Sequence, residues 1–229
     1  MKNGMSALVW VAFVAFIAGT LFGCSSILHK IWPDDDKPLS IQASYVYRAG
    51  GTGPLLPITS GGELNSGDHY KIYFKANQDC YVYVYQTDAT GQVFRLFPLK
   101  QFDGVMLNHN NPVKAEADVV LPSDDRFFYL DNTIGKEKIY FIASLQRNSD
   151  LETLEDRMAK ALQADDERQI SESRQAINAY LTKRGMGAIS KTQTVMVAWN
   201  DADATFPITG YLFESLKEES VHTIDFMHR

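Results

Sequence analysis

The sequence predicts a mainly β protein: an antiparallel β-sandwich of the immunoglobulin-like or transthyretin-like kind that carries a two-helix insertion. Three observations predict this fold class. Apolar residues alternate with period two in about nine short segments beyond residue 40. Gly, Pro, Asn and Asp occur between these segments, where turns are needed. A single block, residues 149–185, instead has the spacing of amphipathic helices.

Composition and charge limit the domain count and the classes of partner. The chain has 229 residues, of which 45% are hydrophobic and 22% are charged, as expected for one globular domain with extensions. The 13 Phe and 11 Tyr residues favour β-structure. Because the net charge is -6 and no cluster of Lys and Arg occurs, we expect no nucleic-acid partner.

The N-terminus has the pattern of an export signal. Lys2 is the only charged residue in the first 23, and "ALVWVAFVAFIAG" is an apolar run of the length of a signal h-region. The following "LFGC" resembles a bacterial lipobox, which implies that residues 1–23 are a cleaved signal peptide and that Cys24 is lipidated. Phe22 departs from the lipobox pattern, where a small or β-branched residue is usual. The alternative is an uncleaved signal anchor, because Ala7–Phe22 is nearly long enough to span a bilayer.

The residues after Cys24 predict a lipid-anchored tether, residues 24–40. Pro33, Pro38 and the aspartates between them forbid a continuous helix or strand, and we interpret "DDD" as a solvated spacer rather than a metal site. Two or three acyl chains anchor a protein stably. Ser25 and Ser26 stand where Asp marks inner-membrane retention in enteric bacteria, so we expect an outer-membrane protein that faces the periplasm.

The remaining residues, 41–229, are expected to form the β-sandwich domain. The helical block has Leu151, Leu154, Met158 and Leu162 on one face, Ser149 or Asp150 as a candidate N-cap, and a break near "ADDE". The helices either dock on the sandwich or form a hairpin that binds a partner. The predicted strands cover residues 41–49, 69–76, 80–87, 92–98, 118–123, 126–131, 136–146, 192–200 and 220–229.

The segment "CYVYVYQ" raises the question of a binding surface. Alternation places Cys80, Val82 and Val84 on one face, which suits the core, and three tyrosines on the other. Two interpretations stay open: the helical insertion covers the rings, or the rings form a binding surface, since Tyr is common at interfaces. The three tyrosines are Tyr81, Tyr83 and Tyr85.

Patterns for catalysis or metal binding are missing. None of the five histidines has metal-ligand spacing, and the sequence contains no GxSxG, SxxK, Walker or GxGxxG motif, so we expect no enzyme, no cofactor and no metal. Asp201 and Asp203 are interpreted as a solvated turn rather than a calcium site. If Cys24 carries lipid, Cys80 has no disulfide partner and is expected to be buried.

A set of spaced positions in the core of the chain forms a recognisable pattern. They are Ser66-Gly67-Asp68, the strand Tyr81–Tyr85, then Gly91, Val93, Leu96, Phe97 and Pro98, and finally Gly135, Glu137, Ile139, Tyr140, Ile142, Ala143 and Ser144. In these positions the chain resembles a family known as domain of unknown function 4384, over about Leu64 to Leu145. The resemblance implies an extracytoplasmic β-sandwich module, often joined to other envelope or signalling domains. The family has no assigned activity, so the resemblance implies no site residues.

These observations together predict a lipid-anchored, non-enzymatic binding or assembly module of the cell envelope with a protein partner. One alternative is a component of a secretion apparatus, similar to the small outer-membrane lipoprotein of type VI systems. The other is an envelope hydrolase whose site converges from distant residues, for example His222 or His109 beside Cys80 or an aspartate.

Overall fold

The computed structural model describes residues 37–187, 190–201, 204–215 and 219–229. All of them except Lys37 belong to one unit, Pro38–Arg229. The predicted signal peptide, Cys24, most of the predicted tether, and Asp203 lie outside the described residues.

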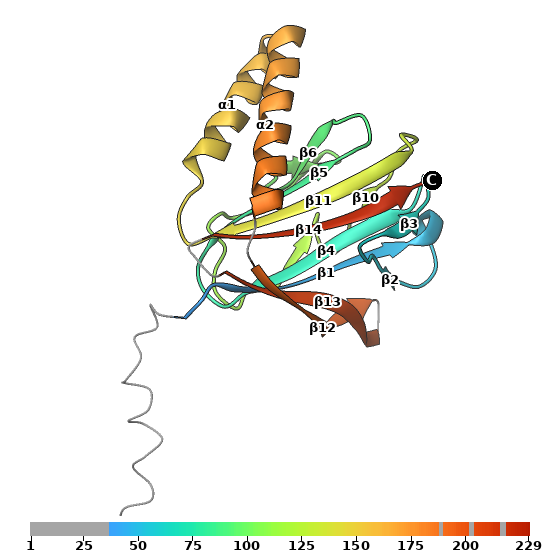
Figure 1. Ribbon diagram of the computed structural model, residues 1–229. Helices are drawn as coiled ribbons and strands as arrows, with labels where there is room; N and C mark the ends of the chain where they lie inside the picture. Colours follow the sequence, from blue (N-terminus) through green and yellow to red (C-terminus); the bar gives the residue numbers. More distant parts are fainter. Residues whose placement is uncertain (1–36, 188–189, 202–203, 216–218) are drawn as a thin grey trace, which may run out of the picture. The chain divides into compact units, whose positions relative to one another are not determined.

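Two main sheets face each other, and two helices lie on the outer side of one of them (Figure 1). We call the sheets A and B. Sheet A has the order β10-β4-β1-β13-β12, with β2 beside β1 and β9 beside β4; sheet B has the order β3-β14-β11-β5-β6. Most neighbouring strands are antiparallel, and β3 and β14 are parallel. The predicted mainly β sandwich with two helices is therefore confirmed.

The bounds of the elements are as follows. Sheet A contains β1 (Ser40–Arg48), β2 (Leu56–Pro57), β4 (His69–Ala76), β9 (Val119–Leu121), β10 (Phe128–Tyr129), β12 (Ser190–Asp201) and β13 (Ala204–Ser215). Sheet B contains β3 (Gly62–Leu64), β5 (Tyr81–Thr87), β6 (Val93–Phe97), β11 (Gly135–Ser144) and β14 (Glu219–His228). The others are η3 (Ala49–Gly51), the hairpin β7 (Gln101–Phe102) and β8 (Val105–Met106), α1 (Ser149–Gln163) and α2 (Glu167–Gly187).

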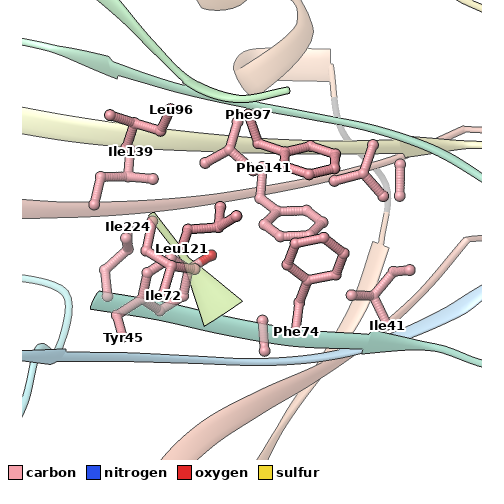
Figure 2. Packing of buried hydrophobic residues seen from close by; sticks show 14 of the residues in the cluster. Ile41, Tyr45, Ile72, Phe74, Leu96, Phe97, Leu121, Ile139, Phe141 and Ile224 are labelled. Atoms are coloured by element: carbon pink, nitrogen blue, oxygen red, sulfur yellow. The ribbon is translucent and has the colours of Figure 1, made fainter. Parts of the chain in front are cut away.

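The main core fills the space between the sheets (Figure 2). Phe74 of β4 meets Phe141 of β11 edge to face, with 5.1 Å between the ring centroids, and Phe141 meets Phe213 of β13 at 5.4 Å. Aromatic pairs of this geometry contribute beyond the area that they bury. Since each ring comes from a different strand, the pairs hold the two sheets in register.

The helical insertion packs on the outer face of sheet B. Tyr83 and Tyr85 of β5 form a buried cluster with Leu151 of α1 and Leu181 of α2. The predicted helical block and its break before Glu167 agree with the structure. The predicted N-cap is wrong: Asn148, not Ser149 or Asp150, caps α1, because its side-chain oxygen accepts a hydrogen bond from Leu151 N at 3.1 Å.

One long strand, β13, was missing from the predicted strands. It contains Pro207 and Gly210, which normally argue against a strand. Pro207 lies opposite Ala198 of β12, beyond the residues that pair with β1, so no second ladder needs its N–H group. Gly210 lies against β1, where an added Cβ would come within 2.6 Å of Ala43 O. Both residues therefore suit the positions that they occupy.

Two of the positions that match the family pattern have a local structural role, one in a turn and one at the end of a strand. Gly67 has a φ of 83°, and the Asp68 carboxylate accepts hydrogen bonds from Asn65 N and Gly50 N, each at 2.8 Å. Pro98 directly follows the last residue of β6.

Among the helices of the described residues, none combines the length and the apolar character needed to cross a bilayer.

His222 of β14 is a buried imidazole among aromatic rings. Its ring stacks on Phe213, with 4.9 Å between centroids, and lies 4.8 Å from the ring of Tyr211 and 6.0 Å from that of Tyr45. Its buried Nε2 has no hydrogen-bond partner among the described residues. Burial lowers the pKa of His222 to about 4.

We predict that His222→Phe flattens the acid limb of the stability curve. In the unfolded wild type, His222 binds a proton with a pKa near 6.5. In the folded state the same imidazole binds a proton only near pH 4. Stability is therefore present above pH 6.5 and is lost as the pH falls, by about 2 kcal/mol at pH 5. Urea unfolding of both proteins at pH 7 and pH 5 measures this loss. An equal loss in wild type and variant would contradict the assignment to His222.

Candidate functional site

A cavity of about 360 Å³ opens between β6 and β10, which lie at the edges of sheets B and A. We call it the aromatic pocket. Such concave sites with apolar walls and a few converging polar groups are the usual form of a binding site. Its lining residues are Tyr70, Gln86, Asp88, Phe94, Arg95, Leu96, Leu99, Gln101, Phe102, Phe128, Tyr129, Leu130, Asp131 and Glu137.

The walls of the aromatic pocket are rings that differ in exposure. Phe102 and Phe128 meet edge to face at a centroid distance of 5.2 Å, and Phe128 is buried. Phe94 and Tyr129 are 39% and 66% exposed. Two large rings thus remain in contact with solvent beside an open cavity, where a bound molecule can cover them.

The polar lining of the aromatic pocket includes a buried hydrogen-bonded chain. Tyr70 donates its hydroxyl proton to Gln86 Oε1, and Gln86 Nε2 donates to Glu137 Oε2 at 2.8 Å. The second carboxylate oxygen, Glu137 Oε1, lies 3.2 Å from His228 Nδ1. Burial raises the pKa of Glu137 above its ordinary value, while the hydrogen bonds from Gln86 and His228 act in the opposite direction.

The charges of the aromatic pocket are unbalanced. Among the described residues of the lining, Arg95 is the only basic one, and its guanidinium lies 3.0 Å from the carboxylate of Glu155 on α1. Asp88 and Asp131 each use Oδ1 to accept backbone N–H groups of their own turns. Neither forms an ion pair within the described ranges. The aromatic pocket therefore favours a positively charged group over an anion.

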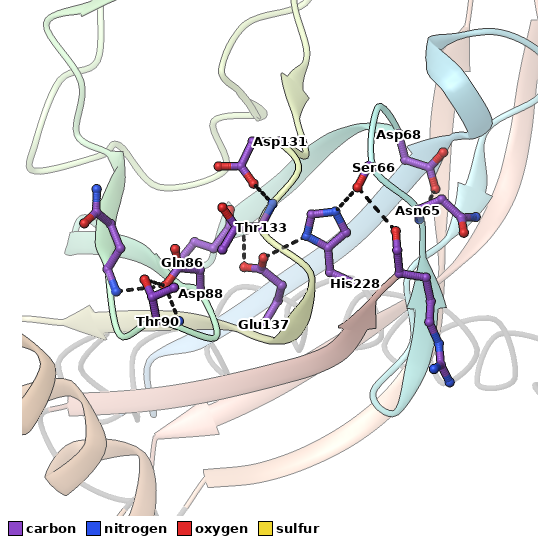
Figure 3. Close-up of polar contacts among 12 residues, drawn as sticks. Asn65, Ser66, Asp68, Gln86, Asp88, Thr90, Asp131, Thr133, Glu137 and His228 are labelled. Carbon is purple, nitrogen blue, oxygen red and sulfur yellow. Dashed lines mark hydrogen bonds and ion pairs between the residues drawn. The ribbon is translucent and has the colours of Figure 1, made fainter.

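The buried chain continues from Glu137 to the surface. Figure 3 shows His228 between Glu137 and Ser66, whose Oγ lies 3.0 Å from His228 Nε2. The order serine, histidine, carboxylate is that of a hydrolase triad. The hydrolase alternative from the sequence named other residues, His222 or His109 beside Cys80 or an aspartate, and did not include Ser66 or His228.

The surroundings of Ser66 do not suit acyl transfer. A hydrolase needs free N–H groups next to the nucleophile to bind the oxyanion. The N–H of Ser66 donates to Arg229 O at 3.0 Å, that of Gly67 to Leu130 O at 2.9 Å, and that of Asp68 to Asn65 O at 3.0 Å. Ser66 is also not a lining residue of the aromatic pocket. The hydrogen-bonded chain of side chains therefore joins the turn at residues 65–68 to the end of β14, and its role is structural.

A second recess, of about 640 Å³, lies between α1 and the segment around β6. We call it the helix groove. Tyr83 and Tyr85 line it and donate hydrogen bonds to Glu152 and Glu155 of α1. The remaining lining residues are Val93, Arg95, Pro98, Leu99, Lys100, His109, Asn111, Arg147, Asp156, Met158, Ala159, Leu162 and Ile177.

The tyrosine row is therefore not an open surface. Tyr83 and Tyr85 are each 1% exposed, and Tyr81 is half-buried at the edge of the same cluster. The sequence left two interpretations open, and the structure shows the rings covered by the helices. The predicted core face is confirmed, because Cys80, Val82 and Val84 lie between the sheets.

The residues named for a hidden catalytic site each have other surroundings than a catalytic site would give them. His109 accepts a hydrogen bond from Leu99 N at 3.0 Å through Nδ1, and its Nε2 lies 2.9 Å from Pro122 O. His222 is surrounded by aromatic rings, as described above. Cys80 is buried, and burial raises its thiol pKa to about 12, far from a reactive thiolate. In the part of the chain that the structure describes, no three His, Cys, Asp or Glu side chains gather as a metal would require.

Sequence reasoning missed the buried chain, although a signal for it existed. Gln86, Glu137 and His228 occupy core-facing positions of three neighbouring strands, in phase with Val84, Ile139 and Phe226. Polar residues at core positions require partners. Three of them at the ends of adjacent strands therefore indicate a shared polar cluster.

The comparison with family models supports the expected resemblance. Residues 63–147 match the family described as domain of unknown function (DUF4384), which confirms the resemblance over that segment. All residues that line the aromatic pocket fall within the match, whereas α1, α2 and His228 fall outside it. No curated protein and no solved structure matches the chain.

We predict that the buried chain contributes stability and has no hydrolytic activity. His228→Ala should lower the free energy of unfolding by about 3 kcal/mol, because it leaves the buried Glu137 carboxylate with an unpaired oxygen. Ser66→Ala should cost about 1 kcal/mol or less, because the hydroxyl is exposed. Urea unfolding measures both losses. Labelling by a fluorophosphonate probe in the wild type and not in Ser66→Ala would contradict the structural role.

Proposed function

We propose that this protein is a lipid-anchored, non-enzymatic binding module of the bacterial cell envelope, and that it binds a partner protein at the aromatic pocket. The observation that carries the proposal is the pocket itself. It combines solvent-exposed rings, the carboxylates of Asp88 and Asp131, which have no ion-pair partner among the described residues, and an opening at the edges of two sheets. Aromatic residues are enriched in the centres of protein interfaces.

The energetics of the rim support a binding role. Phe94 and Tyr129 bury little of their area in the unbound protein, so covering them with a partner removes apolar surface from water. Binding does not have to order β6 or β10, because both strands are already paired in their sheets in the unbound protein. A preformed site of this kind binds with a small cost in conformational entropy.

The non-enzymatic part of the proposal is supported by the state of the candidate reactive groups. Cys80 is a buried thiol with a raised pKa. Among the described residues, neither His109 nor His222 forms a hydrogen bond with Cys80 or with a carboxylate. Ser66 lacks free N–H groups beside it. Binding therefore accounts for the site with fewer assumptions than catalysis.

The envelope location is supported by the sequence around Cys24. "LFGCSS" follows an apolar run and resembles a lipobox, and a proline- and aspartate-containing segment separates Cys24 from β1, which starts at Ser40.

Metabolic labelling with radioactive palmitate tests the anchor. We expect label in the wild type and none in Cys24→Ala, because the cysteine thiol is the lipid acceptor. Cys80→Ala serves as the control and should be labelled like the wild type. Equal labelling of wild type and Cys24→Ala would exclude the lipid anchor at Cys24.

Site-specific photo-crosslinking in intact envelopes tests the binding site. A benzoylphenylalanine at position 129 replaces an exposed ring of the aromatic pocket, and the same residue at position 196 is the matched control. Tyr129 and Met196 are similarly exposed, at 66% and 60%, but Met196 lies on β12. We expect a discrete crosslinked product at position 129 and none at position 196. Identical products at both positions, or none at either, would exclude the aromatic pocket as the binding site.

A further inference from the structure

We propose that the partner contributes an extended segment that adds to β6 as a new edge strand of sheet B and places a lysine or arginine side chain in the aromatic pocket. This inference rests on the proposed function and specifies its mode of binding. Strand addition to a sheet edge obtains affinity from main-chain hydrogen bonds and specificity from pockets for alternate side chains.

The edge of β6 is available for pairing. Within the described residues, β6 is the last strand of sheet B and pairs only with β5. In an antiparallel pair, the N–H and C=O groups of alternate residues point away from the partner strand. Phe94 and Arg95, two consecutive residues of β6, are both exposed, so this part of the edge faces solvent.

Two recesses flank the same edge. Phe94 and Leu96 line the aromatic pocket, whereas Val93 lines the helix groove and Arg95 lines both. Successive side chains of β6 thus point alternately toward the aromatic pocket and toward the helices. Since an added strand has the same alternation, its side chains would enter the two recesses in turn.

The aromatic pocket selects the side chain that enters it. Asp88 and Asp131 carry charges without an ion-pair partner in the described segments, and the carboxylate of Glu137 lies deeper among the lining residues. Phe94 and Tyr129 offer exposed ring faces, which attract cations. A lysine or arginine also fits sterically, because its apolar stem can pass the rings before its charge reaches the carboxylates.

The helix groove selects an apolar side chain on the opposite face of the added strand. Met158 and Leu162 of α1 line it, and Leu162 is 59% exposed. Figure 1 shows both helices rising from the outer face of sheet B near β6. Of the acidic residues that line this recess, Glu152 and Glu155 already form ion pairs with Arg147 and Arg95, and Asp156 also lines it. Valine or leucine side chains beneath α1 would cover Leu162 without breaking these ion pairs.

Arg95 does not protect the edge against strand addition. Exposed edge strands are often blocked by a charged side chain that a second strand would have to bury. The Arg95 guanidinium is instead directed to α1, where it meets Glu155 at 3.0 Å. The charge is thus compensated on the helix side, and the backbone edge of β6 stays open.

Calorimetric titration of the full-length protein in detergent tests the inference. The probe is a synthetic peptide of about nine residues with alternating valine and threonine and a central lysine. A matched peptide carries glutamate in place of lysine. Two further peptides carry backbone N-methyl groups on one or the other set of alternate residues, because only one set donates N–H groups to β6.

Strand addition predicts a one-sided pattern. The lysine peptide should bind saturably, the glutamate peptide should bind at least about tenfold more weakly, and only one of the two N-methylated peptides should lose binding. Equal behaviour of the two N-methylated peptides, or no saturable binding of the lysine peptide up to about 1 mM, would overturn the inference.

Protein variants test the charge selection. Asp131→Asn keeps the Oδ1 acceptor for Thr133 N and removes the charge, so it should reduce the preference for lysine over glutamate by about threefold or more. The matched control is Asp165→Asn, at an exposed turn between α1 and α2 with a φ of 51° that asparagine tolerates. An unchanged preference in Asp131→Asn would overturn the choice of a basic side chain.

The outcomes separate this inference from the proposed function. A crosslink at position 129 together with equal binding of both N-methylated peptides would leave the binding site standing and reject strand addition. A one-sided peptide pattern without any crosslink at position 129 would show β6 as a strand acceptor in vitro and reject the proposed function in the envelope.

Discussion

The constraint on which the rest of the structure depends is that sheet B is apolar on both faces. In β5, Val82 and Val84 face the core between the sheets, and Tyr83 and Tyr85 face outward. A sheet with two apolar faces must be covered twice. Sheet A covers one face, and α1 and α2 cover the other. The helical insertion is thus a required layer of this fold, and its position next to β6 creates the helix groove.

At the end of the core where the aromatic pocket opens, polar side chains are buried, and burial of polar groups costs free energy. Tyr70, Gln86, Glu137 and His228 would each be costly to bury alone, but each finds a partner in the next. The satisfied network holds β4, β5, β11 and β14 together at the position where apolar packing ends. Gln86 and His228 therefore hold the carboxylate of Glu137 beside the cavity.

Sequence reasoning reached the fold more fully than the site, for physical reasons. Local periodicity identifies β5 and the helical block, since Tyr83 and Leu151 follow their element's period. It missed β13, because Pro207 and Gly210 are tolerated only through the particular neighbours that they meet in the sheet. It also missed the aromatic pocket, whose residues come from β4, β5, β6, β7, β10, β11 and the loops beside them. Which strand edges meet is a property of sheet order, and one sequence does not state it.

The boundaries of the family match do not coincide with a folding unit. Residues 63–147 contain β4 and β11 but not β1 and β14, the strands that pair with them along most of their length. Without β1 and β14 the segment would expose two long strand edges and the core residues Phe74 and Phe141. The matched segment supplies the lining residues of the aromatic pocket. The strands outside the match complete the two sheets, and the helices supply much of the helix groove. The aromatic pocket therefore lies within the matched segment. The rest of this chain contributes α1, which forms one wall of the helix groove at the same edge.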